Sequence, residues 1–289
     1  MDTRVLEYFL AVSEEENISH AASLLHVSQP TVSRQLMDLE EELGRKLFER
    51  TNKNIRLTED GLRFRQTAKD ILMLYDKAKH EPSESAEISG ELYLGTSETD
   101  SFSFLADTIS SFQKKYPNTC FHVMAGTSEE IRDAIYKGTV DLGLIIQSVN
   151  TMKLEVMDLD ITDRWGILVR TDSHLASLSS VRIEDLREEL LIIPENSHFQ
   201  NTVREWMIDP SHIRCTYTML NSAMLMVKAK IGTAICLETV KQCIDGVVSI
   251  PFTPERSARM LMVWKKKPVQ TKLFSAFLDE ISMQIKHIK

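Results

Sequence analysis

Side chains that form specific hydrogen bonds are concentrated in one short stretch of the chain, HVSQPTVSRQ. Within it, Gln29 carries an amide that can pair with adenine, and Arg34 carries a guanidinium that can pair with guanine. Thr31 and Pro30 can contact a thymine methyl group, and Ser33 can bond to a base or to a phosphate. These residue types indicate contact with the base edges of DNA, with a polar, solvated helix surface as the alternative.

Signatures of catalysis and of nucleotide binding are absent from the sequence. It contains no GxGxxG or GxxxxGK[ST] phosphate loop, no HExxH zinc motif and no GxSxG nucleophile elbow. The histidines are dispersed, and His122, flanked by Phe121 and Val123 in a predicted strand, fits a structural role better than a metal ligand. We therefore predict no catalytic residue, no metal site, no cofactor and no enzymatic activity.

A helix-turn-helix is predicted to position the base-reading side chains. Helical spacing of apolar residues predicts a first helix over Val5–Val12, and Ser19 can cap a short second helix, HAASLLH. Ser28 as N-cap, Pro30 in the first turn and Gly44 at the end define a third helix. Because the major groove accepts one α-helix, the second helix of such a pair presents its N-terminal side chains to the bases.

A basic patch follows the third helix, although the chain as a whole has a net charge of -8. Between Leu43 and Arg56, Glu49 is the single acidic residue, facing five cations: Arg45, Lys46, Arg50, Lys53 and Arg56. The LFER and IRLT runs around the turn TNKN predict a β-hairpin, or wing, whose cations hold phosphates without reading sequence. The predicted DNA-binding residues are Ser28, Gln29, Pro30, Thr31, Ser33, Arg34, Arg50, Lys53 and Arg56.

A long helix is predicted next, capped by Thr58 and continuing to about Lys79. Its apolar and small residues alternate at spacings of four and three, as in the a/d seam of a coiled coil: Leu57, Gly61, Phe64, Ala68, Ile71, Tyr75 and Ala78. We predict that this seam joins two copies of the chain. The alternative is an amphipathic helix packed on its own domain. The polar segment His80–Gly90 is predicted to be a hinge.

Apolar runs alternate with helical segments from Glu91 to the end of the chain. This alternation predicts parallel sheets covered by helices on both faces. A span of about 200 residues fits two such sheets with a cleft between them better than one sheet.

Composition and cysteine usage exclude several classes of protein. With 43% hydrophobic and 26% charged residues, the chain has a globular composition, and no apolar run approaches the ~18 residues of a membrane span. The N-terminus lacks the apolar core of a signal peptide, so we expect a cytoplasmic protein. The four cysteines form no CxxC pair, which favours free, mostly buried thiols. A redox sensor built on Cys236 and Cys243 is the alternative.

From Val5 to Arg63 the sequence resembles the winged helix-turn-helix of LysR-type transcriptional regulators. The family pattern is matched by YFLAV, SHAASLLHVSQPTVSRQ, LEEELGRKLFER and RLTEDG, and more loosely by YPNTCFHV, GTSEEIRDAI, GTVDLGLII and SHLASLSSVRIEDL. The resemblance implies a multi-domain fold: an all-α winged helix-turn-helix N-terminal domain, a long linker helix and an α/β effector-binding domain. That last domain would comprise two Rossmann-like subdomains, as in type II periplasmic binding proteins.

The resemblance also implies domain boundaries and partners. The DNA-binding domain would cover residues 1–58, the dimerising linker helix and hinge 59–87, and the effector-binding domain 88–289. Within the last, subdomain I would take 88–162 and 264–289, and subdomain II 163–263. The implied partners are double-stranded DNA with a partly palindromic operator, a small-molecule effector, RNA polymerase and further copies of the chain as a homodimer or homotetramer. No membrane partner is implied.

Effectors of such regulators lie in the cleft and are held by loops that connect strands to helices. The helix N-termini at these loops expose unpaired N–H groups, which suit anions. The candidate loops are Gly95–Ser101, Gly126–Ser128, Asn196–Asn201 and Asn221–Ser222. The candidate effector-binding residues are Ser97, Thr99, Ser101, Thr127, Ser128, Phe199, Gln200 and Asn221, although each hydroxyl could instead cap a helix. Glu98 and Asp100 add negative charge, which favours a cationic, zwitterionic or neutral effector over a simple dicarboxylate.

Two hypotheses compete with a regulator, and both share the C-terminal fold. A solute-binding protein would require export and would leave about the first 60 residues unexplained. An enzyme would use Asp or His groups in the cleft, and turnover of a ligand would support it. A thiol switch in the third loop is not expected, because Phe199 stands where the peroxide-sensing branch of the family has its reactive cysteine.

Overall fold

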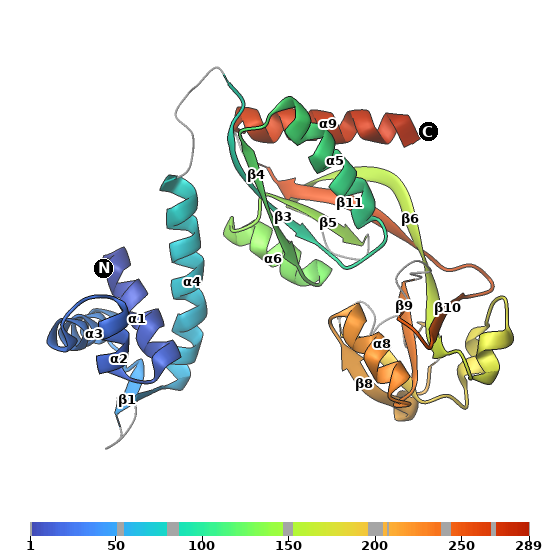
Figure 1. The fold of residues 1–289 in the computed structure, drawn as a ribbon, viewed down its shortest axis with the longest axis horizontal. Helices are drawn as coiled ribbons and strands as arrows, with labels where there is room; N and C mark the ends of the chain where they lie inside the picture. Colours follow the sequence, from blue (N-terminus) through green and yellow to red (C-terminus); the bar gives the residue numbers. More distant parts are fainter. Residues whose placement is uncertain are drawn as a thin grey trace. The chain divides into compact units, whose positions relative to one another are not determined.

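The computed structural model divides the chain into two units, residues 1–81 and 82–289 (Figure 1). It describes residues 2–50, 55–79, 87–146, 153–195, 205–206, 208–237, 244–266 and 270–288, without the side chains of Arg50, His287 and Ile288. No helix in these ranges is both long enough and apolar enough to cross a membrane.

The first unit contains the predicted helices and the predicted hairpin. Its elements are α1 (Thr3–Glu15), α2 (Ile18–Leu24), α3 (Gln29–Leu43), β1 (Phe48–Arg50), β2 (Ile55–Leu57) and α4 (Glu59–Lys79). Leu6, Phe9 and Val12 of α1 pack with Val32 and Leu36 of α3 in one core. These apolar side chains fix the angle at which α3 meets the rest of the unit, and so decide which of its residues face outward.

Helix α3 begins and ends where the sequence predicts. The Ser28 side chain accepts a hydrogen bond from Thr31 N–H, and Gly44 ends the helix in the left-handed conformation with φ 65°. The prediction for α2 is wrong by two residues. Asn17, not Ser19, is its N-cap, because the Asn17 side chain accepts from Ser19 N–H and His20 N–H.

Helix α4 packs against its own domain over its first half, which corrects the prediction of a continuous dimer seam. Gly61, Phe64 and Ala68 are buried in the same core as α1 and α3, and Ile71 packs against that core. A Cβ at Gly61 would lie 2.1 Å from the Leu47 carbonyl oxygen, so glycine permits this close approach. Gly61 and Ala68 therefore serve intramolecular packing, whereas Ala78 is exposed.

The second unit has two lobes. The first lobe has parallel strands β3 (Gly90–Thr96), β4 (Thr119–Ala125) and β5 (Leu142–Ile146). As Figure 1 shows, α5 (Phe102–Lys115) and α9 (Lys272–Ile288) cover one face of this sheet and α6 (Ser128–Lys137) the other. Phe112 and Phe277 meet edge to face at 5.2 Å in the core beneath α5 and α9.

The second lobe repeats the alternation of strands and helices. Its elements are the 3₁₀ helices η1 (His174–Ser177), η2 (Ile183–Leu186) and η3 (Pro210–His212), the strands β7 (Leu191–Pro194), β8 (Ile213–Tyr217), β9 (Thr233–Leu237) and β10 (Val247–Pro251), and α8 (Leu220–Lys228). Strand β7 pairs in parallel with β8 and β9. Ala223 and Val227 of α8 pack on Ile192 and Ala234 of the sheet.

Two strands connect the lobes. Strand β6 (Leu154–Arg170) pairs antiparallel with β11 (Ser257–Lys265) in the first lobe and with β9 and β10 in the second. The nine strands thus form one hydrogen-bonded sheet, in the order β4-β3-β5-β11-β6-β9-β7-β8 with β10 beside β6. The two-lobed α/β fold is confirmed. The prediction of separate, parallel sheets is wrong, because β6 continues through both lobes and pairs antiparallel with β11 in the first and with β9 and β10 in the second.

Candidate functional site

The first two turns of α3 and its N-cap present polar side chains to solvent. Ser28, Gln29, Pro30, Thr31 and Arg34 are exposed, and Ser33 is half-buried. The turn before it is made by residues 25–27, with His26 in the left-handed conformation at φ 53°. This arrangement places one face of a well-capped helix outside the core, as recognition of a DNA groove requires.

Internal hydrogen bonds separate these side chains into two groups. The Ser28 and Thr31 hydroxyls bond to each other at 2.7 Å, and Ser28 Oγ also caps the helix. Ser33 has a partner within the chain as well. Gln29 and Arg34 make no side-chain hydrogen bond in the described part of the chain, so their amide and guanidinium groups are available to an external partner.

The wing hairpin has the predicted strands, but its charges are more balanced than the sequence indicated. Glu49 lies opposite Arg56 in the ladder, and Arg56 is exposed. Arg45 pairs with Asp60 at 3.6 Å and Lys46 with Glu40 at 2.7 Å, so Glu49 is not the only acidic residue near the patch. The side chain of Arg50, and Lys53 altogether, lie outside the described residues.

Glu40 anchors the wing to α3. Its carboxylate, which is almost fully buried, accepts hydrogen bonds from Leu47 N–H at 2.8 Å and Phe48 N–H at 3.0 Å, and pairs with Lys46. Burial alone would raise the pKa of Glu40, but the hydrogen bonds from Lys46, Phe48 and Leu47 together lower it below its ordinary value. Glu40 therefore remains charged and holds the first strand of the wing at the end of α3.

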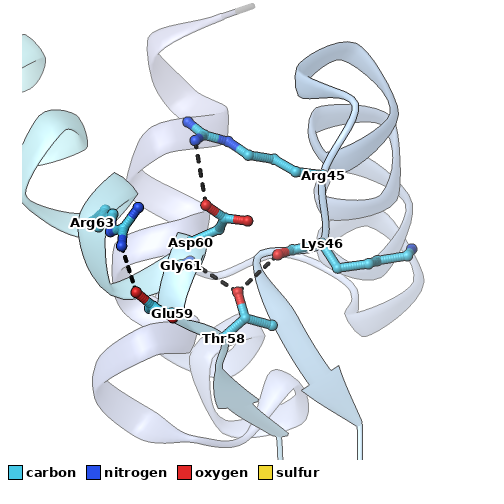
Figure 2. A network of polar contacts seen from close by, with 7 residues as sticks. All are labelled: Arg45, Lys46, Thr58, Glu59, Asp60, Gly61 and Arg63. Atoms are coloured by element: carbon cyan, nitrogen blue, oxygen red, sulfur yellow. Dashed lines mark hydrogen bonds and ion pairs between the residues drawn. The ribbon is translucent and has the colours of Figure 1, made fainter.

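Figure 2 shows how the wing is joined to α4. Thr58 Oγ1 donates to the Lys46 carbonyl at 2.7 Å and accepts from Gly61 N–H at 2.9 Å, which confirms Thr58 as the cap of this helix. Arg63 pairs with Glu59 one turn apart. The position of the wing relative to α3 is thus fixed at both of its ends.

A pocket opens between the two lobes of the second unit. It is lined by the loop after β3, the start of α6, the ends of β5, β7, β8 and β9, the start of α8, and Trp165 of β6. The lining residues are Ser97, Glu98, Thr99, Gly126, Thr127, Ser128, Glu129, Ile146, Trp165, Pro194, Glu195, Tyr217, Thr218, Leu220 and Leu237.

The predicted hydroxyls in this region have different hydrogen-bonding states. Thr127 caps α6 in a reciprocal capping box with Glu130, and Ser128 Oγ accepts from Ile146 N–H at 3.2 Å. Ser101 donates to Asp163 at 2.8 Å and does not line the pocket. By contrast, Ser97 and Thr99 line the pocket, and their buried Oγ and Oγ1 atoms have no hydrogen-bond partner among the described residues.

The three remaining predicted residues do not contribute to the described pocket, whereas the Glu98 carboxylate does. Asn221 is exposed and is not among the lining residues, whereas Phe199 and Gln200 lie outside the described residues. Glu98 points across the pocket, since its Oε2 accepts a hydrogen bond from Leu220 N–H of the other lobe at 2.8 Å. The second lobe therefore contributes backbone, and not the predicted Asn221 side chain, to this contact.

Tyr217 forms part of the pocket floor. Burial raises the pKa of its phenol well above the ordinary value, and the nearby Cys236 and Glu98 raise it further. Its hydroxyl donates to the Ile235 carbonyl at 2.9 Å. Tyr217 is therefore a neutral residue that joins β8 to β9 and lines the pocket.

Comparison with known proteins identifies the chain. The family model for the bacterial regulatory helix-turn-helix protein of the lysR family matches residues 3–62, and the LysR substrate binding domain matches residues 85–285. The chain belongs to the LysR family. The first match contains α3 and the wing, and the second contains the whole inter-lobe pocket.

Curated relatives of this LysR-family chain are named as transcriptional regulators. The HTH-type transcriptional regulator CysL of Bacillus subtilis (strain 168) is 33% identical over 192 residues, 66% of this chain and 64% of CysL. The regulator YwqM of the same strain is 26% identical over 267 residues, 90% of this chain and 84% of its own length. With CysL, the matched part thus spans slightly less than two thirds of the relative.

Solved structures show the same fold. The LysR family regulator CbnR superposes with a TM-score of 0.78 at 21% identity, covering 99% of both chains. Full-length BenM superposes with a TM-score of 0.58 at 22% identity, covering 100% of this chain and 96% of BenM. At these identities the likeness establishes the architecture of the LysR-family chain.

Sequence reasoning missed most of the apolar and acidic lining of the pocket. Trp165 and Leu237 lie inside strands and carry no loop signal, and Glu195 follows β7 by one residue. Glu195 had a detectable signal, because polar residues at the carboxyl ends of parallel strands converge in this class of fold. Of the cysteines, Cys120 is exposed, Cys215 half-buried and Cys236 buried, and Cys243 lies outside the described residues.

Proposed function

We propose that this LysR-family chain is a transcriptional regulator that reads double-stranded DNA with α3 and responds to a small molecule bound in the inter-lobe pocket. The observation that carries the DNA-binding part is the exposed pair Gln29 and Arg34 on the first two turns of a firmly capped helix, where neither side chain bonds to a described residue. Gln29 and Arg34 would read bases, while Ser28 and Thr31 position the helix. The proposal assigns the chain no catalytic activity.

The wing would hold the phosphate backbone. Arg56 is exposed in β2, and Arg50 and Lys53 belong to the same hairpin in the sequence. Phosphate contacts fix the register of a protein on DNA but carry no base information. The regulator would act in the cytoplasm on a partly palindromic operator, where RNA polymerase is a further candidate partner.

A second copy of the chain would complete the DNA-reading surface. Apolar side chains on α4 that its own domain leaves exposed include Leu62 and Met73, which lie eleven residues apart and so on the same face of the helix. Leu74, the next residue after Met73, is also exposed and borders this face. We propose that these residues, in place of the buried Gly61, Phe64 and Ala68, form the contact of a homodimer, with a dimer of dimers as the larger assembly.

The proposed domain division follows the two parts of this function. Residues 1–58 would bind DNA, 59–87 would dimerise and link, and 88–289 would bind the effector, with subdomain I at 88–162 and 264–289 and subdomain II at 163–263. Support comes from the position of the pocket between the lobes and from the two family matches, which cover residues 3–62 and 85–285.

The test compares a base-reading residue with a phosphate-holding residue on a duplex selected from a random library by the wild-type protein. Arg34→Ala should reduce the preference for the selected duplex over random DNA by about tenfold to a hundredfold, the effect of losing one bidentate base contact. Arg56→Ala should weaken binding to both duplexes equally and reduce the slope of log affinity against log salt by about one. Mobility shifts at several salt concentrations measure both effects.

Lys114→Ala, which removes an exposed cation from α5 in the other unit, is the matched control and should leave DNA binding unchanged. Equal losses on selected and random DNA for both Arg34→Ala and Arg56→Ala would refute the assigned roles. A wild-type protein that binds no duplex from the library would refute DNA binding itself.

A further inference from the structure

Helix N-termini around the pocket are already supplied with carboxylates from the chain itself. At α6, Glu130 accepts hydrogen bonds from Thr127 N–H at 2.8 Å and from Thr127 Oγ1 at 3.0 Å. At α8, Glu98 accepts from Leu220 N–H at 2.8 Å. At α5, the Asp163 carboxylate accepts from the hydroxyl of the N-cap residue Ser101 and not from the helix backbone. A negatively charged ligand would have to displace these groups or lie beside them, which like-charge repulsion opposes.

The described side chains that line the pocket include acidic residues but no basic ones. Glu98, Glu129 and Glu195 contribute carboxylates, and no Lys, Arg or His occurs among the described lining residues. Glu98 belongs to the first lobe and Glu195 to the second. Glu195 accepts from Thr216 Oγ1 at 3.1 Å through one oxygen, as Glu98 accepts from Leu220 N–H through one oxygen. A carboxylate has two oxygens that accept hydrogen bonds, so both residues keep capacity for a donor.

Buried hydroxyls in the same region also lack partners. Ser97 Oγ and Thr99 Oγ1 are unpaired in side chains that are only 8% and 7% exposed, and both residues line the pocket. Asp163, which accepts from Ser101 and does not line the pocket, is 9% exposed, and its Oδ2 has no hydrogen-bond partner among the described residues. Buried polar groups are rarely left without a hydrogen bond, and a carboxylate oxygen requires a donor. The Ser97 and Thr99 hydroxyls can accept hydrogen bonds, and together with the Glu98 and Glu195 carboxylates they favour a ligand that brings donors and positive charge.

We propose that the effector is a compound with a protonated amino group, held between the Glu98 and Glu195 carboxylates with the Ser97 and Thr99 hydroxyls as further acceptors. An ammonium group fits this set because it has three donors and no acceptor. The apolar part of the molecule lies against Trp165, Ile146 and Leu237, which line the same pocket. This inference rests on the proposed function of the pocket as the effector site.

The test uses probes that share a skeleton and differ in charge. The full-length wild-type protein is titrated calorimetrically with 2-phenylethylamine, 3-phenylpropionate and 2-phenylethanol, and with the corresponding amine, acid and alcohol built on a 3-methylbutyl skeleton. At least one amine should bind about tenfold or more tightly than the acid of the same skeleton, because hydrogen bonds between charged groups are stronger than those between neutral groups.

Two variants locate the binding and a third controls for charge. Glu98→Gln keeps an oxygen for Leu220 N–H and removes only the negative charge, and Glu195→Gln does the same in the second lobe. Each should weaken amine binding by about tenfold and leave the alcohol unaffected. Glu184→Gln removes an exposed charge from η2, away from the pocket, and should bind the amine like the wild type.

Each remaining outcome counts against the proposal. Tighter binding of an acid than of its matched amine would overturn the charge preference, and so would the absence of binding by both amines. Amine binding that is insensitive to Glu98→Gln and Glu195→Gln would place the ligand elsewhere. None of these results depends on DNA, so a failure of this inference is distinct from a failure of the DNA-binding function, which the mobility shifts read separately.

Discussion

The two candidate sites differ in how their polar side chains divide between structure and contact. On α3, the residues that hold the helix and those free to contact DNA are separate: Ser28 and Thr31 bond to each other, and Gln29 and Arg34 face outward. Around the pocket, structural and ligand-facing hydroxyls are mixed, since Thr127 and Ser128 serve the fold and Ser97 and Thr99 do not.

The difference reflects how each surface is assembled. Gln29 and Arg34 lie five residues apart on one helix, so local geometry decides which side chains face outward. The pocket is assembled from strand ends and helix starts that are distant in the sequence, and long-range hydrogen bonds decide which hydroxyls remain available. Contact residues on a helix face can therefore be named from a motif, whereas those of such a pocket require the fold.

The largest expected effect tests whether the DNA-reading surface depends on close packing beneath it. Gly61→Ala places a methyl group against the Leu47 carbonyl, where the space allows no Cβ, and should destabilise the first unit by about 3 kcal/mol. Hydrogen exchange read by mass spectrometry should accelerate in peptides from α1 and α3. Peptides from β3 and β5 in the other unit should be unchanged.

Arg65→Ala, an exposed substitution on the same helix, controls for a general effect of changing α4. If α1 and α3 of the Gly61→Ala variant were protected from hydrogen exchange as in the wild type, the wing and α4 would be able to separate without loss of stability. The surface would then be less firmly supported than its contacts indicate.

A smaller effect is expected at Glu40, which joins α3 to the wing. Glu40→Gln loses a charged hydrogen bond with Lys46 and should destabilise the Leu47–Phe48 backbone by about 1–2 kcal/mol at pH 7. The pKa of Glu40 is lowered in the folded protein, so its contribution is present above pH 4.5 and is lost as the pH falls through the lowered value.

Hydrogen exchange of the peptide containing Leu47 and Phe48, measured at neutral pH and at decreasing pH, checks this expectation. Wild type and variant should differ at pH 7 and converge below pH 4.5, since protonation removes the charge that the variant lacks. A difference that persists unchanged at low pH would assign the effect to packing and not to ionisation.

The smallest effects test the distinction between hydroxyls that stabilise the fold, such as that of Thr127, and unpaired hydroxyls, such as that of Thr99. Thr127→Ala removes a helix cap and should cost about 1 kcal/mol. Thr99→Val removes an unpaired buried hydroxyl of similar shape and should be neutral or slightly stabilising. Thermal unfolding of the full-length protein compares the two. A loss at Thr99 equal to that at Thr127 would give both hydroxyls a structural role and remove the contrast between them.

The sequence predicts the first unit better than the second for physical reasons. Ser28, Gly44 and Thr58 act through bonds to residues close in the chain, so their roles as helix boundaries are recognisable. The sequence predicts a dimer seam through Gly61, because helical spacing alone does not distinguish an intramolecular neighbour from an intermolecular one. In the structure Gly61 approaches Leu47 of its own chain. The direction of β6 and the contact of Glu98 with Leu220 depend on pairing across long stretches of sequence, which no local pattern encodes.

Strand β6 has a mechanical consequence for the pocket that it borders. It pairs with β11 up to Arg164, with β9 from Trp165 and with β10 from Gly166, so the backbone passes from one lobe to the other at Arg164 and Trp165. A Cβ at Gly166 would lie 2.5 Å from the Ile250 carbonyl oxygen, which shows how closely the strands approach there. We therefore expect the lobes to move by a small torsion about β6, with Trp165 at its axis, and not by wide opening and closing.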